Sequence, residues 1–304
     1  MRHFLNIIDH DSETLQQILD RALFLKGGQL RGENPKPLAN KIVSLVFEKP
    51  SLRTRVSFEA ATVQLGGTSL FQSGSEVGLG SREPLCDFAR TMSQYVNALV
   101  LRVFRQSTVE EVARFASVPV VNGLSDISHP CQAMADLLTM MELFGNLKKH
   151  TLVFVGDGNN VARSLAVLCG RLGVNFILAT PQGYGFPSDF LERYQKHVGA
   201  KLPQEVRDPS QAVKNADVIY TDVWTSMGQE TEKEIRLKQF APYQVNGSLL
   251  SKAPAHVKVL HCLPAHRGEE ITAEVMEQHA GAIFQQAGNR MHAQKAVLEW
   301  LFQS

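Results

Sequence analysis

Short apolar runs alternate with helix-period segments along nearly the whole 304-residue chain. Continuous runs of Val, Ile, Leu and Phe are typical of strands that are buried on both faces of a parallel sheet. The predicted strands are Ile42–Phe47, Thr68–Phe71, Ala98–Val103, Val118–Val121, Thr151–Val155, Phe176–Ala179, Val218–Thr221, Val257–Leu260 and Ala282–Phe284. The predicted helices are Ser12–Lys26, Ser57–Leu65, Pro130–Phe144, Val161–Leu172, Thr272–Gln278 and Gly288–Phe302. This alternation predicts an α/β fold with right-handed crossovers and helices on both sheet faces.

The strand–helix pattern starts again after a polar junction near residue 150. Four predicted strands precede a helix that ends near Gly145-Asn146, and five follow Lys148-Lys149-His150. We therefore expect two doubly wound parallel-sheet domains, 1–145 and 146–288, with a C-terminal helix of about 289–304 that packs back on the first. Because ligands of such sheets bind beyond the carboxyl ends of the strands, an active-site cleft between the domains is expected.

Composition and charge narrow the class of protein. Hydrophobic residues make up 44% of the chain and charged residues 20%, which is usual for a globular protein. Lys plus Arg number 31 against 30 for Asp plus Glu, and a net charge of +1 argues against a nucleic-acid or anionic-membrane surface. The four cysteines have no C-x-x-C spacing, so neither a disulfide framework nor a zinc knuckle is expected. Neither a signal peptide nor an apolar run of ~18 residues occurs, so we expect a cytoplasmic protein.

The segment after the first predicted strand has the features of an anion site. Ser51-Leu52-Arg53-Thr54-Arg55 opens the next helix, where free backbone N–H groups and the helix dipole favour a phosphate. Basic residues are unfavourable in a first helical turn, so a bound anion would compensate them. The alternative is that Ser51 is only an N-cap and that the arginines are solvated. Val56, Ala60 and Val63 are expected to form the apolar stripe of this helix.

Two further predicted strands lead to polar residues of the same kind. Arg102 lies within an otherwise apolar strand, where an unpaired charge is costly. His129 precedes Pro130, which suits the first position of a helix, and Gln132 follows in the first turn. A neutral His and a Gln can donate to a carbonyl oxygen and accept from an amide. A capping role is the alternative for His129, and Cys131 is interpreted as a packing residue.

In the second half of the chain, Gly156–Ala162 almost matches the dinucleotide fingerprint G-x-G-x-x-G/A but is off by one residue. The next strand also ends without the Asp or Glu that would hold a ribose, which weakens a nicotinamide-cofactor reading. Asn159 and Asn160 could instead bind a small polar ligand. Asp222 ends a later strand, and with Ser226 and the Met227 amide it suits a zwitterion, although an Asp that caps a turn is the alternative.

The run His261-Cys262-Leu263-Pro264 follows the next predicted strand. A metal site formed by His261, Cys262 and His266 is excluded by spacing, because adjacent residues do not easily share one tetrahedral ion. A Cys–His nucleophile pair and a thiol that lines the cleft beside exposed carbonyls both stay open. Arg290 lies at a turn before the last predicted helix.

Taken in order, S-L-R-T-R, H-P-C-Q, D-V-W-T-S-M-G and H-C-L-P resemble the carbamoyltransferase family over almost the whole chain. The last two motifs are specific to its ornithine branch, whereas the aspartate branch shares only S-x-R-T-R and H-P-x-Q. The resemblance implies transfer of the carbamoyl group of carbamoyl phosphate to the side-chain amine of L-ornithine, giving L-citrulline and phosphate. It implies neither metal nor organic cofactor. Citrulline would serve either arginine biosynthesis or its own breakdown.

The resemblance also implies roles for individual residues. Those expected to bind carbamoyl phosphate are Ser51, Leu52, Arg53, Thr54, Arg102, His129, Gln132, Cys262, Leu263 and Arg290. Those expected to bind ornithine are Asn160, Asp222, Ser226 and Met227. Catalytic roles are expected for Arg102 and His129, which would polarise the carbonyl oxygen, and for Asp222 and Cys262, which would help the amine lose a proton.

Two positions depart from the pattern of the family. Leu52 replaces the commonest Thr, but mainly the backbone amide acts there, so phosphate binding is expected to survive. Gly78 aligns with a Gln that, in the family, often reaches into the site of a neighbouring subunit, and Arg82 is a candidate substitute. The resemblance further implies a homotrimer with shared sites, and closure of the two domains on the substrates.

Other functions stay open beside this one. N-acetylornithine or putrescine could be the amine, but acetylation removes the ammonium that Asp222 would bind, so Asp222 with Ser226-Met227 favours a free amino acid. A nicotinamide-dependent oxidoreductase lacks its ribose acid. A non-catalytic amino-acid-binding protein would not need the phosphate site.

Overall fold

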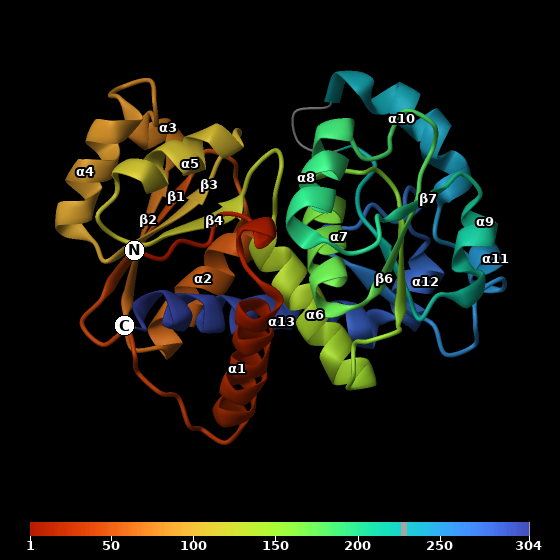
Figure 1. Ribbon diagram of the computed structural model, residues 1–304, viewed down its shortest axis with the longest axis horizontal. Helices are drawn as coiled ribbons and strands as arrows, with labels where there is room; N and C mark the ends of the chain where they lie inside the picture. Colours follow the sequence, from red (N-terminus) through yellow and green to blue (C-terminus); the bar gives the residue numbers. More distant parts are fainter. Residues whose placement is uncertain (226–229, 304) are drawn as a thin grey trace. The chain divides into compact units, whose positions relative to one another are not determined.

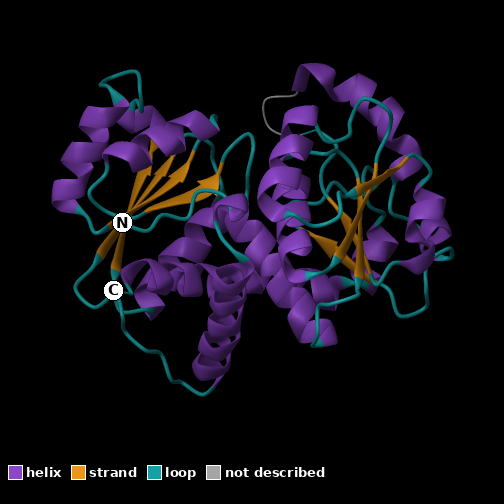
Figure 2. Cartoon of the chain, in the orientation of Figure 1, coloured by secondary structure: helices purple, strands orange, loops and turns teal. Residues whose placement is uncertain are grey.

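The computed structural model describes residues 1–225 and 230–303 and divides into two compact units. The first unit is Met1–Leu138 with Asn289–Ser304, and the second is Thr139–Gly288. Each unit is a parallel β-sheet with helices packed around it, which Figures 1 and 2 show. The expected fold class, two parallel-sheet α/β domains, is confirmed.

The first unit contains a four-stranded sheet in the order β2-β1-β3-β4. Its strands are β1 (Ile42–Phe47), β2 (Thr68–Ser73), β3 (Ala98–Arg102) and β4 (Val120–Leu124). Its helices are α1 (Ser12–Leu30), α2 (Leu52–Gln64), α3 (Gly74–Val77), α4 (Leu85–Tyr95), α5 (Gln106–Phe115) and most of α6 (Pro130–Phe144). Phe4 extends the sheet beyond β4 by pairing with Val121. Helices α4 and α5 share one apolar core with the sheet, which includes Phe88, Val109 and Leu101.

The second unit contains a five-stranded sheet in the order β7-β6-β5-β8-β9. Its strands are β5 (Thr151–Val155), β6 (Asn175–Ala179), β7 (Gln204–Val206), β8 (Val218–Thr221) and β9 (Lys258–His261). Its helices are α7 (Asn160–Leu172), α8 (Ser188–Val198), α9 (Pro209–Ala212), α10 (Lys233–Phe240), α11 (Gly247–Leu250) and α12 (Ala273–Gln278). Helix α13 (Ala280–Phe302) begins in this unit and ends in the first.

The strand orders place one topological switch point in each sheet. In the first unit β1 lies between β2 and β3, and in the second β5 lies between β6 and β8. The chain continues from β1 and from β3 toward opposite edges of the first sheet, and from β5 and from β8 toward opposite edges of the second. Ligands of such sheets bind in the crevice at the carboxyl ends of these strand pairs. Of the site residues expected from the sequence, residues 51–54 follow β1, Arg102 ends β3 and Asp222 follows β8. His129 follows β4 and Cys262 follows β9, so neighbouring strands contribute as well.

Two strand predictions differ from the structure. Ala282–Phe284 is not a strand but lies within α13, because an apolar run of this length does not distinguish a strand from a helix. The turn expected before Arg290 is also wrong, since Gly288-Asn289 lies inside the same continuous helix. Ile283 is buried and Phe284 is exposed, which a helical path produces. The sequence analysis missed β7, whose Gln204 and Glu205 lack an apolar pattern. An edge strand of this polar kind is protected against pairing with other chains.

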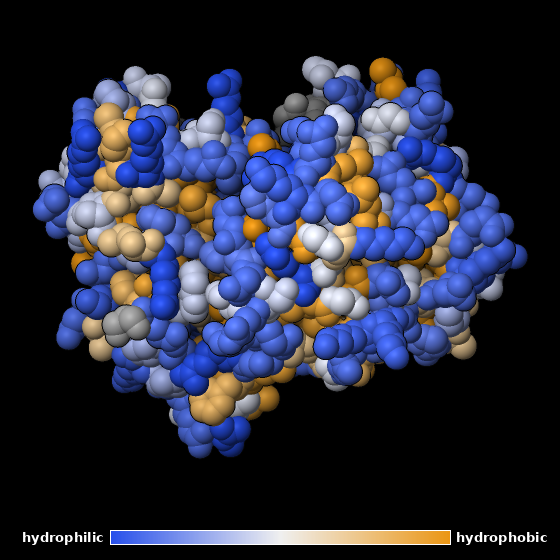
Figure 3. Space-filling view, viewed as in Figure 1, coloured by the Kyte–Doolittle hydropathy of each residue, from blue (hydrophilic) through white to orange (hydrophobic). Residues whose placement is uncertain are grey.

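The predicted apolar stripe of α2 lies on the wrong face. The buried face contains Phe58 and Ala61, whereas Val56 and Val63 are exposed. Leu52 is exposed as well, so α2 carries apolar side chains on its outer face. Elsewhere apolar residues are scattered among hydrophilic ones on the face drawn in Figure 3. None of the helices within residues 1–225 and 230–303 has the length and apolar character needed to span a bilayer.

Candidate active site

The N-terminus of α2, which follows β1, has the features of an anion site. Ser51 is its N-cap, and the Ser51 side chain accepts a hydrogen bond from the Thr54 backbone N–H at 3.3 Å. The first turn contains no acidic residue. Arg55 has partners of its own, since its guanidinium pairs with Glu59 at 2.9 Å and lies over the Phe71 ring. Arg53, in contrast, forms no ion pair with any described residue.

Arg102 ends β3 beside β1 and is 7% exposed. Burial, followed by the positive charges of Arg290 and Arg53, lowers its pKa to about 10. Its Nε atom is buried without a hydrogen-bond partner among the described residues, and no carboxylate there pairs with it. A buried cation with cations for neighbours is electrostatically costly, and an anion between them would relieve that cost.

Arg290 reaches this group from the other end of the chain. It lies on the part of α13 that belongs to the first unit, and its Nη2 donates to Thr54 Oγ1 at 2.5 Å. Both side chains are almost fully buried. Since the Thr54 oxygen already accepts this bond, its own hydroxyl proton is left to donate toward a ligand.

His129 lies at the start of α6, which begins at Pro130 as expected. Burial, then the charges of Arg290 and Arg102, hold the pKa of His129 well below 6.5. The imidazole is therefore neutral at neutral pH and carries one N–H donor. Burial raises the pKa of the neighbouring Cys131 thiol to about 12, so Cys131 is a thiol that packs and no nucleophile.

Gln132 provides a hydrogen-bond acceptor, its Oε1 atom, beside the cationic donors of the first unit. It is 1% exposed, and its Nε2 donates to Asp136 Oδ1 at 2.8 Å. Its Oε1 is buried and has no partner among the described residues. The first unit thus combines cationic donors, a neutral imidazole and one amide oxygen, brought together from the end of β3 and from the helices α2, α6 and α13.

Asp222, directly after β8, is the centre of the polar group in the second unit. Its carboxylate accepts from Cys262 Sγ at 3.0 Å, from Asn159 Nδ2 at 3.0 Å and from the Val223 backbone N–H at 2.8 Å. Cys262 follows β9, and Asn159 follows β5. The ends of three neighbouring strands therefore bring a thiol, an amide and a carboxylate together.

Of the two asparagines at the start of α7, Asn159 contacts Asp222. Asn159 is the N-cap of α7, and its Oδ1 accepts from the backbone N–H groups of Val161 and Ala162. Asn160 Oδ1 accepts from Val161 N at 3.0 Å, and its role toward ornithine stays a prediction. Ser226 and Met227 lie outside the described residues.

The turn after β9 is held by buried polar contacts. His261 Nδ1 accepts from the Leu263 backbone N–H at 2.8 Å, and His261 Nε2 lies 3.0 Å from Glu270 Oε1. These contacts fix Leu263, whose φ of 59° is left-handed, and its carbonyl stays a predicted ligand of the carbamoyl amide. His266, Glu269 and Glu270 place one candidate metal-ligand atom each within 4.8 Å of one another, but the His261 contact already accounts for Glu270.

Comparison with known proteins agrees with this geometry. The carbamoyl-P binding domain of aspartate/ornithine carbamoyltransferases matches residues 2–142, and their Asp/Orn binding domain matches residues 148–301. The chain belongs to this family. An ornithine carbamoyltransferase of Archaeoglobus fulgidus is 51% identical, covering 98% of this chain and 96% of the relative. The resemblance drawn from the four motifs is therefore confirmed.

Solved structures of the family share the fold. Ornithine carbamoyltransferase from Pyrococcus furiosus is 45% identical with a TM-score of 0.93, covering 98% of this chain and 96% of that one. The anabolic enzyme from Campylobacter jejuni is 36% identical with a TM-score of 0.92, covering 99% of both chains.

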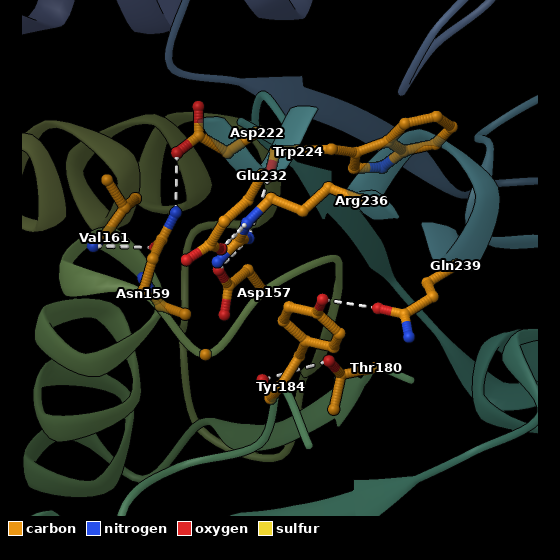
Figure 4. Close-up of polar contacts among 12 residues, drawn as sticks. Asp157, Asn159, Val161, Thr180, Tyr184, Asp222, Trp224, Glu232, Arg236 and Gln239 are labelled. Atoms are coloured by element: carbon orange, nitrogen blue, oxygen red, sulfur yellow. Dashed lines mark hydrogen bonds and ion pairs between the residues drawn. The ribbon is translucent and has the colours of Figure 1, made fainter. Parts of the chain in front are cut away.

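A buried arginine that the sequence analysis missed supports the second-unit group (Figure 4). Arg236 Nη1 donates to Asp157 Oδ2 at 2.7 Å and to the Trp224 carbonyl at 3.0 Å. Its Nε donates to Glu232 at 2.9 Å. Asp157 lies two residues before Asn159, and Trp224 two residues after Asp222, so Arg236 ties the two ligand-bearing strand ends together. No motif marked it, because an Arg on a charged helix is usually solvated.

The lowered pKa of His129 predicts a pH-dependent stability. As pH falls below 6.5 the unfolded chain binds a proton on this residue and the folded chain does not, so the free energy of unfolding decreases until the pH reaches the folded pKa. The slope from this one group is at most about 1.4 kcal/mol per pH unit. Urea unfolding between pH 5 and 7 should show a flatter dependence for His129→Gln, and equal slopes would contradict the assignment.

Replacement of Arg236 should destabilise the second unit. Burial already raises the pKa of Asp157 despite the hydrogen bond from Arg236, so Arg236→Met leaves a buried carboxyl without its partner. We expect a loss of roughly 3–5 kcal/mol in the free energy of unfolding by urea. The control Lys238→Met, on the exposed face of α10, should change it by less than ~0.5 kcal/mol. Adding Asp157→Asn to Arg236→Met should recover part of the loss; no recovery would show that the pair is not its cause.

Proposed function

We propose that the chain transfers the carbamoyl group of carbamoyl phosphate to the side-chain amine of L-ornithine, giving L-citrulline and phosphate. The observation that carries the proposal is the buried, uncompensated charge of Arg102 beside Arg53 and Arg290. A dianionic acyl phosphate supplies the missing negative charge, and no neutral substrate would. The curated relatives that cover nearly the whole chain, all named as ornithine carbamoyltransferases, support the same reaction.

The first unit would bind and activate the donor. The α2 N-terminus, with Ser51, the Leu52 amide, Arg53 and Thr54, would hold the phosphate together with Arg102. Donors from Thr54, Arg102, Arg290 and neutral His129 would face the carbonyl oxygen, and Gln132 Oε1 would accept from the carbamoyl amide. These donors stabilise the negative charge that develops on the oxygen during attack.

The second unit would present the acceptor. Asp222, oriented by Asn159 and Cys262, is proposed to hold the amino acid and to lie near the amine that reacts. The amine loses a proton and attacks the carbamoyl carbon, a C–N bond forms, and the C–O bond to phosphate breaks. Asn160, Ser226 and the Met227 amide are proposed as further ornithine ligands. Proximity of two bound substrates supplies much of the rate.

We propose a homotrimer in the cytoplasm that serves arginine biosynthesis. The exposed apolar side chains of Leu52, Val56 and Val63 on α2 support an assembly, because burying them against a second copy is favourable. Gly78 has a φ of 61°, and a Cβ there would lie 3.0 Å from Arg82 Cβ, so the loop disfavours a Gln at that position. Exposed Arg82 is the residue we propose to reach a neighbouring site in its place.

A citrulline assay tests the reaction and its amine together. With carbamoyl phosphate present, L-ornithine should give a carbamoylated product, whereas N-acetylornithine and putrescine should react at least tenfold more slowly. The physical reason is that N-acetylornithine lacks the α-ammonium that Asp222 would bind, and putrescine lacks the carboxylate proposed to bind Ser226 and the Met227 amide. Mass spectrometry of the products in the three parallel reactions measures this. Faster turnover of either competitor would transfer the assignment to that amine, and no product from any would reject the transferase.

Arg53 and Arg55 form a matched pair for the phosphate site. Arg53→Ala should weaken binding of phosphonoacetamide, a stable analogue of carbamoyl phosphate, by about 10- to 100-fold, the range expected for a charge-assisted hydrogen bond. Arg55→Ala should change the dissociation constant less than about threefold, since Arg55 is already paired with Glu59. Isothermal titration calorimetry measures both, and equal effects would contradict a specific role for Arg53.

A further inference from the structure

We propose that Asp136 is a positioning residue that sets which end of the Gln132 amide faces the carbamoyl group, and thereby lets the site distinguish an NH₂ group from a methyl group. The proposal rests on the proposed function, because it assigns Gln132 Oε1 to the carbamoyl amide. Asp136 is completely buried one helical turn after Gln132 on α6. No motif and no expected site residue includes it.

The hydrogen bond between the two side chains sets the orientation of the Gln132 amide. Gln132 Nε2 donates to Asp136 Oδ1 at 2.8 Å. Turning the amide over would replace this N–H donor by the amide oxygen, and two oxygens would then face each other at this contact. Gln132 Oε1 must then face away from Asp136, and it is there that it is buried without a partner among the described residues. A buried acceptor of this kind costs free energy unless a donor arrives.

The carbamoyl group supplies such a donor, and its shape makes the orientation matter. Its NH₂ and its carbonyl oxygen are similar in size, so shape alone does not prevent the group from binding reversed. Donors from Arg102, Thr54 and His129 favour the oxygen on one side, and an acceptor on the other side selects the NH₂. If Gln132 were free to turn, its NH₂ would donate to the carbonyl oxygen of the reversed group, and that oxygen would then lack the activating donors. Such reversed binding is unproductive.

Two stable phosphonates test this directly. Phosphonoacetamide and acetonylphosphonate differ only in NH₂ against CH₃, so the ratio of their dissociation constants isolates the amide contact from the phosphate contact. The wild type should prefer the amide about tenfold, the effect of one net hydrogen bond. Asp136→Leu should bring the ratio close to one while acetonylphosphonate binding changes less than threefold. A merely structural role would weaken both ligands together.

A double-mutant cycle and two further variants complete the test. Gln132→Leu should also abolish the preference, and Asp136→Leu added to it should have no further effect on the ratio. Asp136→Asn keeps the shape of the side chain but permits both orientations of the Gln132 amide. It should therefore lower the preference for phosphonoacetamide over acetonylphosphonate about threefold, and it should change kcat by a larger factor than the KM for ornithine. The control Thr62→Val removes a buried hydroxyl that donates to Phe58 O on α2, and should leave the ratio unchanged.

The outcomes separate this inference from the reaction itself. A preference that survives within twofold in Asp136→Leu, or in Asp136→Asn where only that variant folds, overturns the role of Asp136 and leaves the transferase standing. A wild type that binds neither phosphonate overturns the proposed function and this inference with it. A wild type that binds both phosphonates equally overturns the inference alone, because the phosphate site is then intact and the protein does not distinguish the amide from a methyl ketone.

Discussion

A guanidinium group removed from water needs a counter-charge, and at the end of β3 the chain provides none among its described residues. Arg102 is instead surrounded by further positive charge from Arg53 and Arg290, and burial keeps His129 neutral. The fold brings this group together from the end of β3 and from helices at both ends of the chain. The free chain carries an electrostatic cost here that the proposed phosphate would remove. The strand ends, the α2 cap and the course of α13 together produce this arrangement.

In the second unit the central charged group is a carboxylate and not a guanidinium. Asp222, which we propose binds an ammonium, is held in place by a thiol, an amide and a backbone N–H. Neutral donors orient the carboxylate without cancelling its charge, whereas a salt bridge from Arg or Lys would compete with the substrate. Arg236 pairs with Asp157 instead, so the cation that stabilises this region is directed to a different carboxylate.

Much of this was readable from the sequence because parallel sheets collect ligands at strand ends. Locating the buried strands therefore located Arg53, Arg102, Asp222 and Cys262 as well, and Pro130 marked the helix start beside His129. Residues that act through other residues were not readable. Asp136 shares no motif with a ligand, yet an Asp within the apolar run of α6 was a signal of a buried polar contact. The length of α13 was missed because a short apolar run has no period of its own.

Some buried polar atoms of the two units have hydrogen-bond partners and others have none. Arg102 Nε and Gln132 Oε1 are buried without partners among the described residues. The Nε2 of Gln132 is bonded to Asp136, and Asp157 and Glu270 are bonded to Arg236 and His261. Each unmet buried group costs about 1–3 kcal/mol in the free protein. The hydrogen bond to Asp136 keeps the Gln132 amide from turning to find another partner. A substrate that meets these groups recovers that free energy on binding, so part of the affinity for the donor is stored in the fold as lost stability. Stabilising the free protein by giving Gln132 Oε1 a partner would therefore weaken the site it serves.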